Sequence, residues 1–484
     1  MILVFIQAVL VIGAGVGLFL LWRLAAPSER WLRYVVAAGF LGRAILGELL
    51  FWISWARLPV GRSMQLGNGL WTFAIDASNY VPLASWGADH GLWAIITFNR
   101  TAPSVMYVQL LGVANWLFGI VTSAGLLVNL LCYLGMIAIL VRWPVKTPAA
   151  RNAAAVVIAA ISLSPAFVLW SLQPLKDTFF QFLVVAFVAS CAWWQRAWSM
   201  PDHTAARFGL GVLLSVLLYA LGGIRWYFAF ALIIAASLFL FLTAFRTAAR
   251  PIVAFSAAIV LTIVFCRSLV AAAAPYLPPQ LLAVMAPSTT LGTIPQLPVA
   301  LIGGIDSARD GFQRSGGNTA IIDSNTPPAV VPVVAVAAPR VAVPAVPKRE
   351  VAQPVAPPMS RTSRFLSGVA VTVLPRTIGE RLNLFHIAGG RGMLWFTELD
   401  TLIFDLSLLL AITVVTLHFR MSLRNPLTWL VLAMIVLVGG PLVYSITNYG
   451  TLFRLREMIY LGLLFTPLAV ASAAPARTRV DAAS

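Results

Sequence analysis

The stretch Ile75-Asp76-Ala77-Ser78-Asn79-Tyr80 is polar and lies between two long apolar runs, near residues 34–54 and 123–142. Of the 484 residues, 60% are hydrophobic and only 10% are charged. A soluble domain carries about 25% charged residues, so this composition predicts an integral membrane protein. An isolated carboxylate such as Asp76 then belongs either to a solvated loop or to a functional site.

The apolar runs predict an all-α polytopic membrane protein, because a helix needs roughly 20 apolar residues to cross the hydrocarbon core. About eleven such spans are expected. They lie near residues 2–22, 34–54, 123–142, 152–170, 178–195, 207–223, 227–245, 252–271, 398–418, 427–446 and 452–473. The apolar run near 105–119 is shorter, and we expect it to form a helix that lies at the membrane surface.

The positive charge of the chain is spread along its length. The 33 lysines and arginines outnumber the 16 acidic residues and give a formal charge of +17. They form short clusters between apolar runs rather than one basic patch, so we expect no nucleic-acid partner. Basic loops of this kind mark the cytoplasmic side of a membrane. The clusters assigned to that side are Arg23/Arg30/Arg33, Arg142/Lys146/Arg151, Arg196/Arg207, Arg246/Arg250, Arg420/Arg424 and Arg477/Arg479.

The remaining polar segments fall on the opposite, extracytoplasmic side and define the domain organisation. We predict an N-terminal transmembrane module over residues 1–274, with a polar outer loop at 55–122. A C-terminal transmembrane module covers 397–484, and an extracytoplasmic loop over 275–396 joins the two. The proline-dense tract 326–358 within that loop cannot form a helix or a central strand, so we expect it to be disordered.

Three charged groups stand at the extracytoplasmic ends of predicted spans. Lys176 and Asp177 form either a simple ion pair at a helix end or a phosphate anchor with a carboxylate that positions it. Arg225 interrupts an apolar hairpin. It either snorkels at the turn or binds an anionic headgroup through its forked donors.

Arg454 and Arg456 follow Asn448-Tyr449-Gly450-Thr451 at the start of the last predicted span. Helix N-termini attract anions, so two arginines at this position indicate a negatively charged ligand between them and the helix. The alternative is a solvated interface in which Arg456 neighbours Glu457.

The sequence lacks the motifs that mark several common catalytic and binding functions. The chain has no Gly-rich nucleotide loop and no Ser-His-Asp pattern in a suitable context. His90 and His386 are far in sequence from other ligands, so we assign no metal site. A carboxylate base that faces cationic groups suits transfer from a lipid-linked phosphate donor. The base activates an acceptor hydroxyl while the cations stabilise the departing phosphate.

In their order along the chain, these stretches resemble the GT-C class of polytopic glycosyltransferases, which use polyprenyl-phosphate or polyprenyl-diphosphate sugars. The stretches are Asp76-Ala77-Ser78-Asn79-Tyr80, Pro103 to Gly119, Ala124 to Arg142, Leu175-Lys176-Asp177 and Asn448-x-Gly450-Thr451-x-x-Arg454-x-Arg456. They cover most of the chain outside the first span and the proline-dense tract. Each is short and weakly specific, so the resemblance rests on their order and their common side.

The resemblance implies a GT-C-like helix bundle in which Asp76 is the catalytic base. It implies substrate-binding roles for Tyr80, Lys176, Asp177, Arg225, Asn448, Arg454 and Arg456. The donor is then a polyprenyl-phosphate-linked sugar, and the acceptor a cell-envelope glycan, glycolipid or protein. Other envelope-assembly proteins are further candidate partners. No cofactor is expected, and the need for a divalent metal stays open.

The chain departs from the class in its first outer loop. Many members carry two adjacent acids there, whereas Asp76 is followed by Ala77. A second acid then comes from Asp89 or Asp177, or the chain is a non-catalytic relative.

Two other functions stay open. An O-antigen-type polymerase or ligase also handles lipid-linked sugars, but with residues of a large late loop such as His386 and Arg391. A transporter or flippase for lipid-linked sugars places polar residues near the bilayer midplane, often with internal repeats. The sequence shows no repeat and its polar groups gather on one side, which favours an enzyme.

Overall fold

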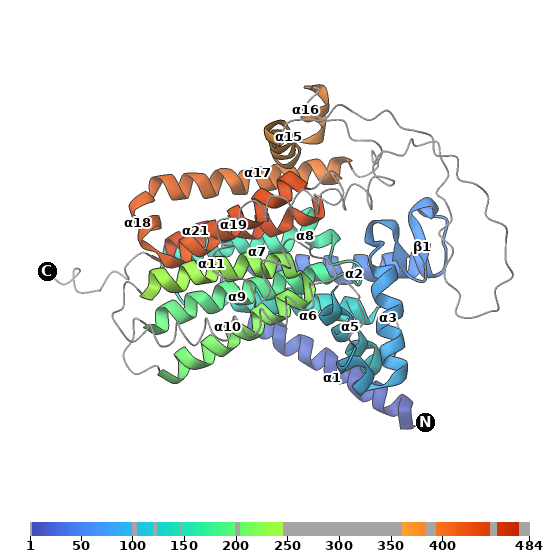
Figure 1. The fold of residues 1–484 in the computed structure, drawn as a ribbon. Helices are drawn as coiled ribbons and strands as arrows, with labels where there is room; N and C mark the ends of the chain where they lie inside the picture. The colour runs from blue at the N-terminus through green and yellow to red at the C-terminus, as the bar shows by residue number, and fades with distance from the viewer. Residues whose placement is uncertain are drawn as a thin grey trace, which may run out of the picture.

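The computed structural model describes residues 2–98, 104–119, 123–145, 147–198, 204–244, 361–382, 394–445 and 453–473. These residues are mostly helical (Figure 1), with a short antiparallel hairpin of β1 (Gln65–Gly67) and β2 (Leu70–Trp71). The predicted span near 252–271 and the proline-dense tract 326–358 lie outside the described residues.

Six described helices are long and apolar enough to cross a membrane. They are α2 (Arg30–Trp55), α6 (Ala124–Val141), α9 (Lys176–Trp198), α10 (Thr204–Ile224), α17 (Leu394–Leu417) and α19 (Pro426–Ser445). Shorter apolar segments lie in α1 (Ile2–Ala25), α5 (Val105–Phe118), α7 (Pro148–Leu163), α11 (Trp226–Ala244) and α21 (Glu457–Ala471). The prediction of a helical protein with membrane-spanning segments is therefore confirmed at this level.

The predicted outer loop at 55–122 is largely ordered, which differs from the expectation of a polar loop around Asp76. After the hairpin come the one-turn helix η2 (Thr72–Ala74), α3 (Ala77–His90), α4 (Leu92–Ile96) and α5. Gly91, with φ of +90°, separates α3 from α4, a backbone conformation that glycine adopts without strain. The buried side chains Tyr80, Tyr107 and Leu111 pack α3 against α5. Asp76 thus lies at the start of a packed helix.

The run predicted as one span near 152–170 is divided at Ser164-Pro165 into α7 and the short α8 (Pro165–Leu169). Pro165 has no N–H, so the Ile161 carbonyl loses its usual partner four residues on. Arg43 of α2 replaces it, donating from Nη2 to the Ile161 carbonyl at 2.7 Å and from Nη1 to the Ser162 carbonyl at 3.0 Å. The interruption is therefore hydrogen-bonded although it is buried.

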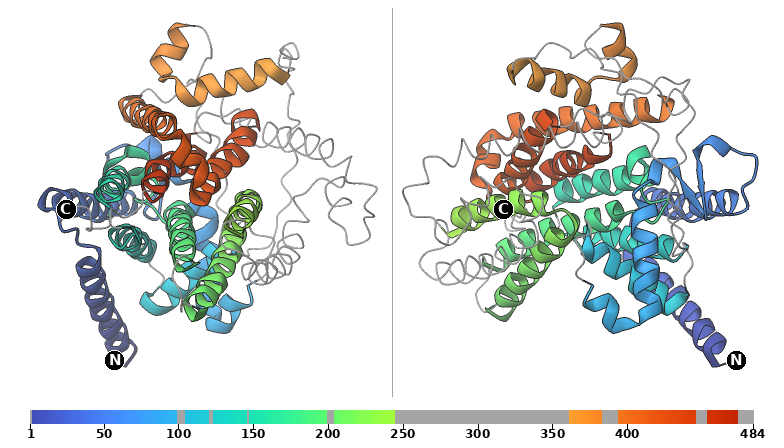
Figure 2. Two further views of the ribbon diagram at one scale, coloured as in Figure 1. Left: turned by 90° about the vertical axis from the view of Figure 1, so that its left-hand side faces the viewer. Right: turned by 45° about the vertical axis from the view of Figure 1, so that its right-hand side comes forward.

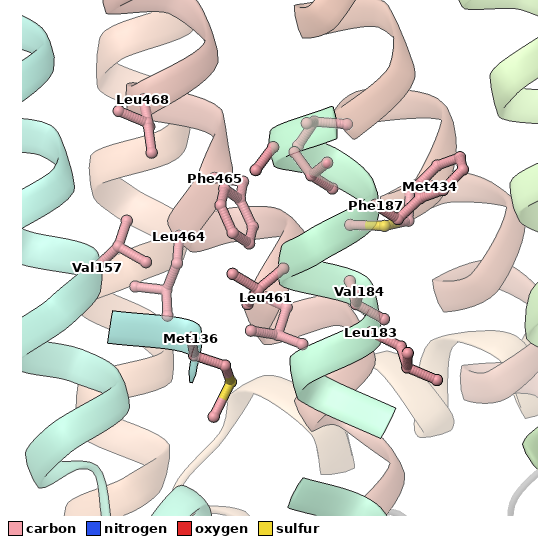
Figure 3. Close-up of a cluster of buried hydrophobic side chains, with 14 of the residues drawn as sticks. Met136, Val157, Leu183, Val184, Phe187, Met434, Leu461, Leu464, Phe465 and Leu468 are labelled. Atoms are coloured by element: carbon pink, nitrogen blue, oxygen red, sulfur yellow. The ribbon is translucent and has the colours of Figure 1, made fainter. Parts of the chain in front are cut away.

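The largest apolar core surrounds α21, whose side chains are buried on nearly every side. Figure 3 shows Leu461, Leu464 and Phe465 of this helix between neighbours from α6, α7, α9 and α19. A short helix that is apolar all round fits the centre of a bundle rather than its lipid-facing surface.

The helix ends gather in two groups at opposite ends of the bundle. At one end, Trp143 Nε1 donates to Ser472 Oγ at 2.9 Å, and Gln195 Nε2 donates to Asn425 Oδ1 at 2.9 Å. We call this the arginine-rich end, because it also carries Arg142, Arg196, Arg420 and Arg424. The other end holds the starts of α3 and α9 and is called the site end. The 23 residues of α9 run between them, which at 1.5 Å per residue is about 34 Å.

Three further helices lie outside the elements given so far, and the one-turn helix η1 (Arg62–Met64) precedes β1. α15 (Arg361–Val373) and α16 (Arg376–Arg381) lie on the outside of the bundle beside α17 and α19 (Figure 2). α18 (Phe419–Arg424) joins α17 to α19 at the arginine-rich end.

Candidate functional site

Asp76 occupies the N-cap position of α3 and leaves its carboxylate free for other partners. Its backbone is helical, with φ −61° and ψ −29°, and its side chain makes no capping hydrogen bond. Its Oδ2 atom instead accepts a hydrogen bond from Arg454 Nη1 at 2.5 Å.

The start of α3 is held in place by a small apolar cluster at the site end. Ala74 and Ala77 flank Asp76 in the sequence and are completely buried. They pack with Trp170, which follows α8, and with Phe453, which precedes Arg454. The same packing therefore positions Asp76 and brings Arg454 to it.

Arg454 connects two carboxylates that lie 101 residues apart in the chain. Its Nε and Nη2 atoms both donate to Asp177 Oδ2, at 2.9 and 2.6 Å, while its Nη1 atom donates to Asp76 Oδ2. Asp177 also accepts a hydrogen bond at Oδ1 from Nη2 of Arg225. The structure thus brings together four of the charged residues that the sequence singles out.

Burial divides these four residues into an interior part and an open part. The side chains of Asp177 and Arg225 are 0% and 3% exposed, and that of Arg454 is 15% exposed. Asp76 is 37% exposed. The Asp177 carboxylate is therefore closed to solvent, whereas the Asp76 carboxylate is open to it.

Lys176 adds a cation beside this group, on the side of Tyr80. Its Nζ donates to Ser104 Oγ at 2.6 Å and lies 5.6 Å from the centre of the Tyr80 ring. Ser104 in turn donates to the Ile224 carbonyl at 3.0 Å, which links the site to the end of α10. Lys176 forms no ion pair with any residue in the described part of the chain.

Tyr80 contributes a neutral donor. Its burial, together with the nearby Asp76 carboxylate, raises the pKa of the phenol above its usual value. The ring also packs edge-on against Tyr107, with the ring centres 5.5 Å apart. Tyr80 therefore stays protonated at physiological pH and adds no negative charge to the site.

The ion pairs of the site do not include every cation. Arg225 and Arg454 pair with Asp76 and Asp177, and the buried Glu457 carboxylate lies near Asp177 and accepts a hydrogen bond from Gln181 Nε2. Lys176 has no ionic partner among the described residues. An anionic group that enters beside Lys176 and Arg454 would neutralise it, and phosphate matches the donors of both side chains.

Aromatic rings line the arginines, a feature that sequence reasoning missed. The Arg454 guanidinium lies 5.6 Å from the Trp170 ring centre, and Arg225 lies 4.7 Å from Phe180. Trp170 Nε1 is buried without a hydrogen-bond partner. Trp170 and Phe180 lie in apolar runs, so in the sequence they look like core residues. Only the structure shows that an arginine lies near each ring.

Arg456 belongs to a different ion pair, so its predicted place beside the other site cations is not observed. Its Nη2 donates to Asp400 Oδ2 at 2.6 Å and its Nη1 donates to Thr401 Oγ1 at 3.0 Å. Asp400 also accepts hydrogen bonds from Ser164 Oγ and from the Ala166 N–H. Asp400 thus joins α17 to the start of α8, and Arg456 joins α17 to the start of α21.

The other candidates fall outside this site. Asp89 is exposed near the end of α3, 13 residues beyond Asp76, or about 20 Å along the helix. His90 Nδ1 lies 2.7 Å from the Trp86 carbonyl. Asn448, His386 and Arg391 lie outside the described residues. Among the described residues, no group of three or more His, Cys, Asp or Glu side chains could hold a metal ion.

The chemical capacity of the site follows from this geometry. It presents one accessible carboxylate, a neutral phenol and an unpaired ammonium around a guanidinium that two acids share. Such an arrangement can accept a proton at the carboxylate and hold a phosphate at the cations. No family model, curated protein or solved structure matches the chain.

Proposed function

We propose that the protein is a glycosyltransferase of the bacterial inner membrane, similar in design to the GT-C class. It transfers a sugar from a polyprenyl-phosphate donor to a cell-envelope glycan, glycolipid or protein on the extracytoplasmic side. The observation that supports the proposal most is the meeting of Asp76, Asp177, Arg225 and Arg454 beside Lys176.

The donor phosphate binds beside Lys176 and Arg454 in this proposal. Arg454 already shares its guanidinium between Asp76 and Asp177, so a phosphate competes with Asp76 for the same N–H groups. Binding of the donor therefore releases Asp76 from part of its ion pair. A carboxylate that loses a cationic partner becomes a better base.

In the transfer step, Asp76 takes the proton from the acceptor hydroxyl. The acceptor oxygen forms a new bond to the anomeric carbon of the sugar while the bond from that carbon to the phosphate oxygen breaks. The electron pair leaves with the polyprenyl phosphate, whose added negative charge is stabilised by Lys176 and Arg454. The Tyr80 hydroxyl, neutral at this pH, is available as a further donor to the phosphate or the sugar.

The second acid of the site is Asp177 rather than Asp89, since only Asp177 shares a partner with Asp76. Complete burial keeps Asp177 from contacting substrate. Its role in this proposal is to position Arg225 and Arg454.

The proposal also includes a membrane topology that is more detailed than the six long apolar helices establish. About eleven spans then cross the membrane, and α5 lies at its surface beside α3. The arginine-rich end faces the cytoplasm, in keeping with the positive-inside rule, and the site end faces outward.

The decisive experiment compares Asp76→Asn with Asp89→Asn in purified protein reconstituted in liposomes. The assay supplies radiolabelled polyprenyl-phosphate sugars and a membrane extract of the producing strain as the source of acceptors. Asp76→Asn is expected to lower transfer by about 10²- to 10⁴-fold, the usual contribution of a general base, while Asp89→Asn keeps full activity.

Two results would overturn the proposal. One is transfer by Asp76→Asn at the rate of the unaltered protein. The other is movement of lipid-linked sugar across the vesicle membrane without chemical change, which identifies a transporter.

A further inference from the structure

A cavity of about 420 Å³ lies at the arginine-rich end, at the opposite end of α9 from the proposed catalytic site. It is formed where the end of α9, α18 and the end of α21 meet. Its volume falls in the range of small-ligand sites, about 300–1,000 Å³. The site that contains Asp76 makes no use of this cavity.

The lining of the cavity combines cationic, polar and apolar side chains, the apolar ones being Met421 and Ala473. Arg420 and Arg424 of α18 supply the charges, and Gln195, Asn425 and Ser472 supply polar groups. No acidic residue is among the lining side chains. Neither arginine forms an ion pair with a residue in the described ranges. Two uncompensated guanidinium groups at a cavity favour an anion, and their forked donors favour phosphate.

The polar side of the cavity is held rigid by hydrogen bonds to other helices. Asn425 is 2% exposed and donates from Nδ2 to the Ala469 carbonyl at 2.6 Å. It also accepts from Gln195 Nε2, at 2.9 Å, and from the Leu427 N–H. Ser472 accepts from Trp143 Nε1 at 2.9 Å. The cavity is therefore built by fixed contacts between helix ends and is not a gap between loose side chains.

The surface next to the cavity is apolar and points outward. Leu417, Phe419 and Leu423 are 75%, 57% and 42% exposed, and they flank Arg420 and Arg424 in the sequence. Along α17 the apolar surface continues through Leu406, Leu409 and Ile412, which are all more than half exposed. A ligand with a phosphate and acyl chains would pair with the arginines and also cover the exposed apolar side chains, whereas free phosphate would pair only with the arginines.

We infer that this cavity binds the phosphate headgroup of an acidic phospholipid, with the acyl chains lying along α17. The occupant is thus separate from the donor of the proposed transfer reaction. Basic pockets at the cytoplasmic ends of membrane helices attract anionic lipids electrostatically. A lipid bound in this cavity would hold the ends of α9, α18 and α21 together, so their association would depend on the lipid composition of the membrane.

The test measures lipid binding to the purified full-length protein by native mass spectrometry, with phosphatidylglycerol and phosphatidylcholine compared at equal concentration. Phosphatidylglycerol is expected to bind more tightly. Arg420→Gln and Arg424→Gln should each weaken it by about fivefold, the effect of one basic residue near an anionic surface. The double variant should lose about 25-fold if the two contributions add.

Two control variants separate this site from general charge effects. Arg30→Gln removes an exposed arginine at the start of α2, a helix end that does not line the cavity. It should leave the affinity within about twofold of the original. The variant Arg420→Lys/Arg424→Lys keeps the positive charge that directs membrane insertion, and it should bind more weakly than the unaltered protein but more tightly than the glutamine pair.

Three outcomes would overturn the inference. The first is equal binding of phosphatidylglycerol by the unaltered protein and the double glutamine variant. The second is a loss in Arg30→Gln as large as in Arg424→Gln. The third is arginine-dependent binding of inorganic phosphate with no preference for phosphatidylglycerol, which assigns the cavity to a soluble anion. None of these results depends on whether Asp76 supports transfer.

Discussion

The two ends of α9 carry charge in opposite ways. At its start, Asp177 is fully buried and accepts hydrogen bonds from two arginines, one of which also pairs with Asp76. At the other end of the bundle, Arg420 and Arg424 are exposed and have no described acidic partner. A buried charge needs a partner because desolvation is costly, whereas an exposed charge does not. Burial therefore requires the arginines of the site end to have acidic partners, whereas the exposed arginines of the other end are stable without them.

The largest expected effect concerns the side of the membrane on which each end lies. Asp89→Cys at the site end and Leu423→Cys at the arginine-rich end place one exposed thiol each in a cysteine-free background. A membrane-impermeant maleimide should label Asp89→Cys only in right-side-out vesicles and Leu423→Cys only in inverted vesicles, because α9 separates the ends by about the bilayer thickness.

Labelling of both positions from the same side would break the comparison. The matched control is each variant in detergent, where both thiols should react.

The next effect concerns the stability of the buried ion pairs. Asp177→Asn leaves Arg225 and Arg454 without their shared carboxylate, so the free energy of unfolding should fall by about 3–5 kcal/mol. Unfolding in mixed micelles, followed by tryptophan fluorescence, measures the change. Asp89→Asn, at an exposed position on α3, should stay within about 0.5 kcal/mol of the unaltered protein. If the two variants were equally stable, the ion pairs would not support the site end.

A smaller effect is expected for the unpaired cation. Lys176→Gln should weaken the binding of polyprenyl phosphate by about tenfold or more, since a hydrogen bond to a charged group contributes about 1.5–3 kcal/mol. Lys176→Arg keeps the charge and should retain most of the affinity. Fluorescence quenching with a short-chain polyprenyl phosphate provides the measurement. Unchanged affinity in Lys176→Gln would exclude Lys176 from the phosphate site.

The smallest effect should come from the arginine-rich end in the absence of lipid. Arg424→Gln removes an exposed charge without a described ion pair. Its free energy of unfolding in lipid-free micelles should change by less than about 0.5 kcal/mol. A loss as large as that of Asp177→Asn would show that the two ends do not differ in the way their charges are used.

Much of the fold could be predicted from the sequence, because the length of an apolar run sets the length of a membrane helix. α6, α9 and α19 begin and end within a few residues of their predicted spans. The break at Ser164-Pro165 was not predicted, because a hydropathy pattern does not register the loss of a single backbone N–H at a proline. The helix that starts after Asp76 was also missed, because the stretch is polar and its packing partners come from distant segments.

The candidate site was predictable as a set of residues but not as a set of contacts. A charged residue at the end of an apolar span is costly, and this singles out Asp177 and Arg454, whereas Asp76 stands out as an isolated carboxylate in a polar stretch. Their pairing depends on the fold, since Asp177 and Arg454 are 277 residues apart. Arg454 and Arg456 were grouped because they are close in sequence. Residues two apart in a helical turn point in different directions, and Arg456 accordingly pairs with Asp400.

The hydrogen bonds from Arg43 to the last carbonyls of α7 have a consequence for how the site end moves. An interrupted membrane helix with free carbonyls can act as a swivel, whereas this one is clamped by a side chain from a neighbouring helix. The clamp fixes the angle at which α8 leaves α7, and with it the position of Trp170 beneath Arg454. Because Ala74 and Ala77 pack on Trp170, the same clamp also limits how far the start of α3, and with it Asp76, can move.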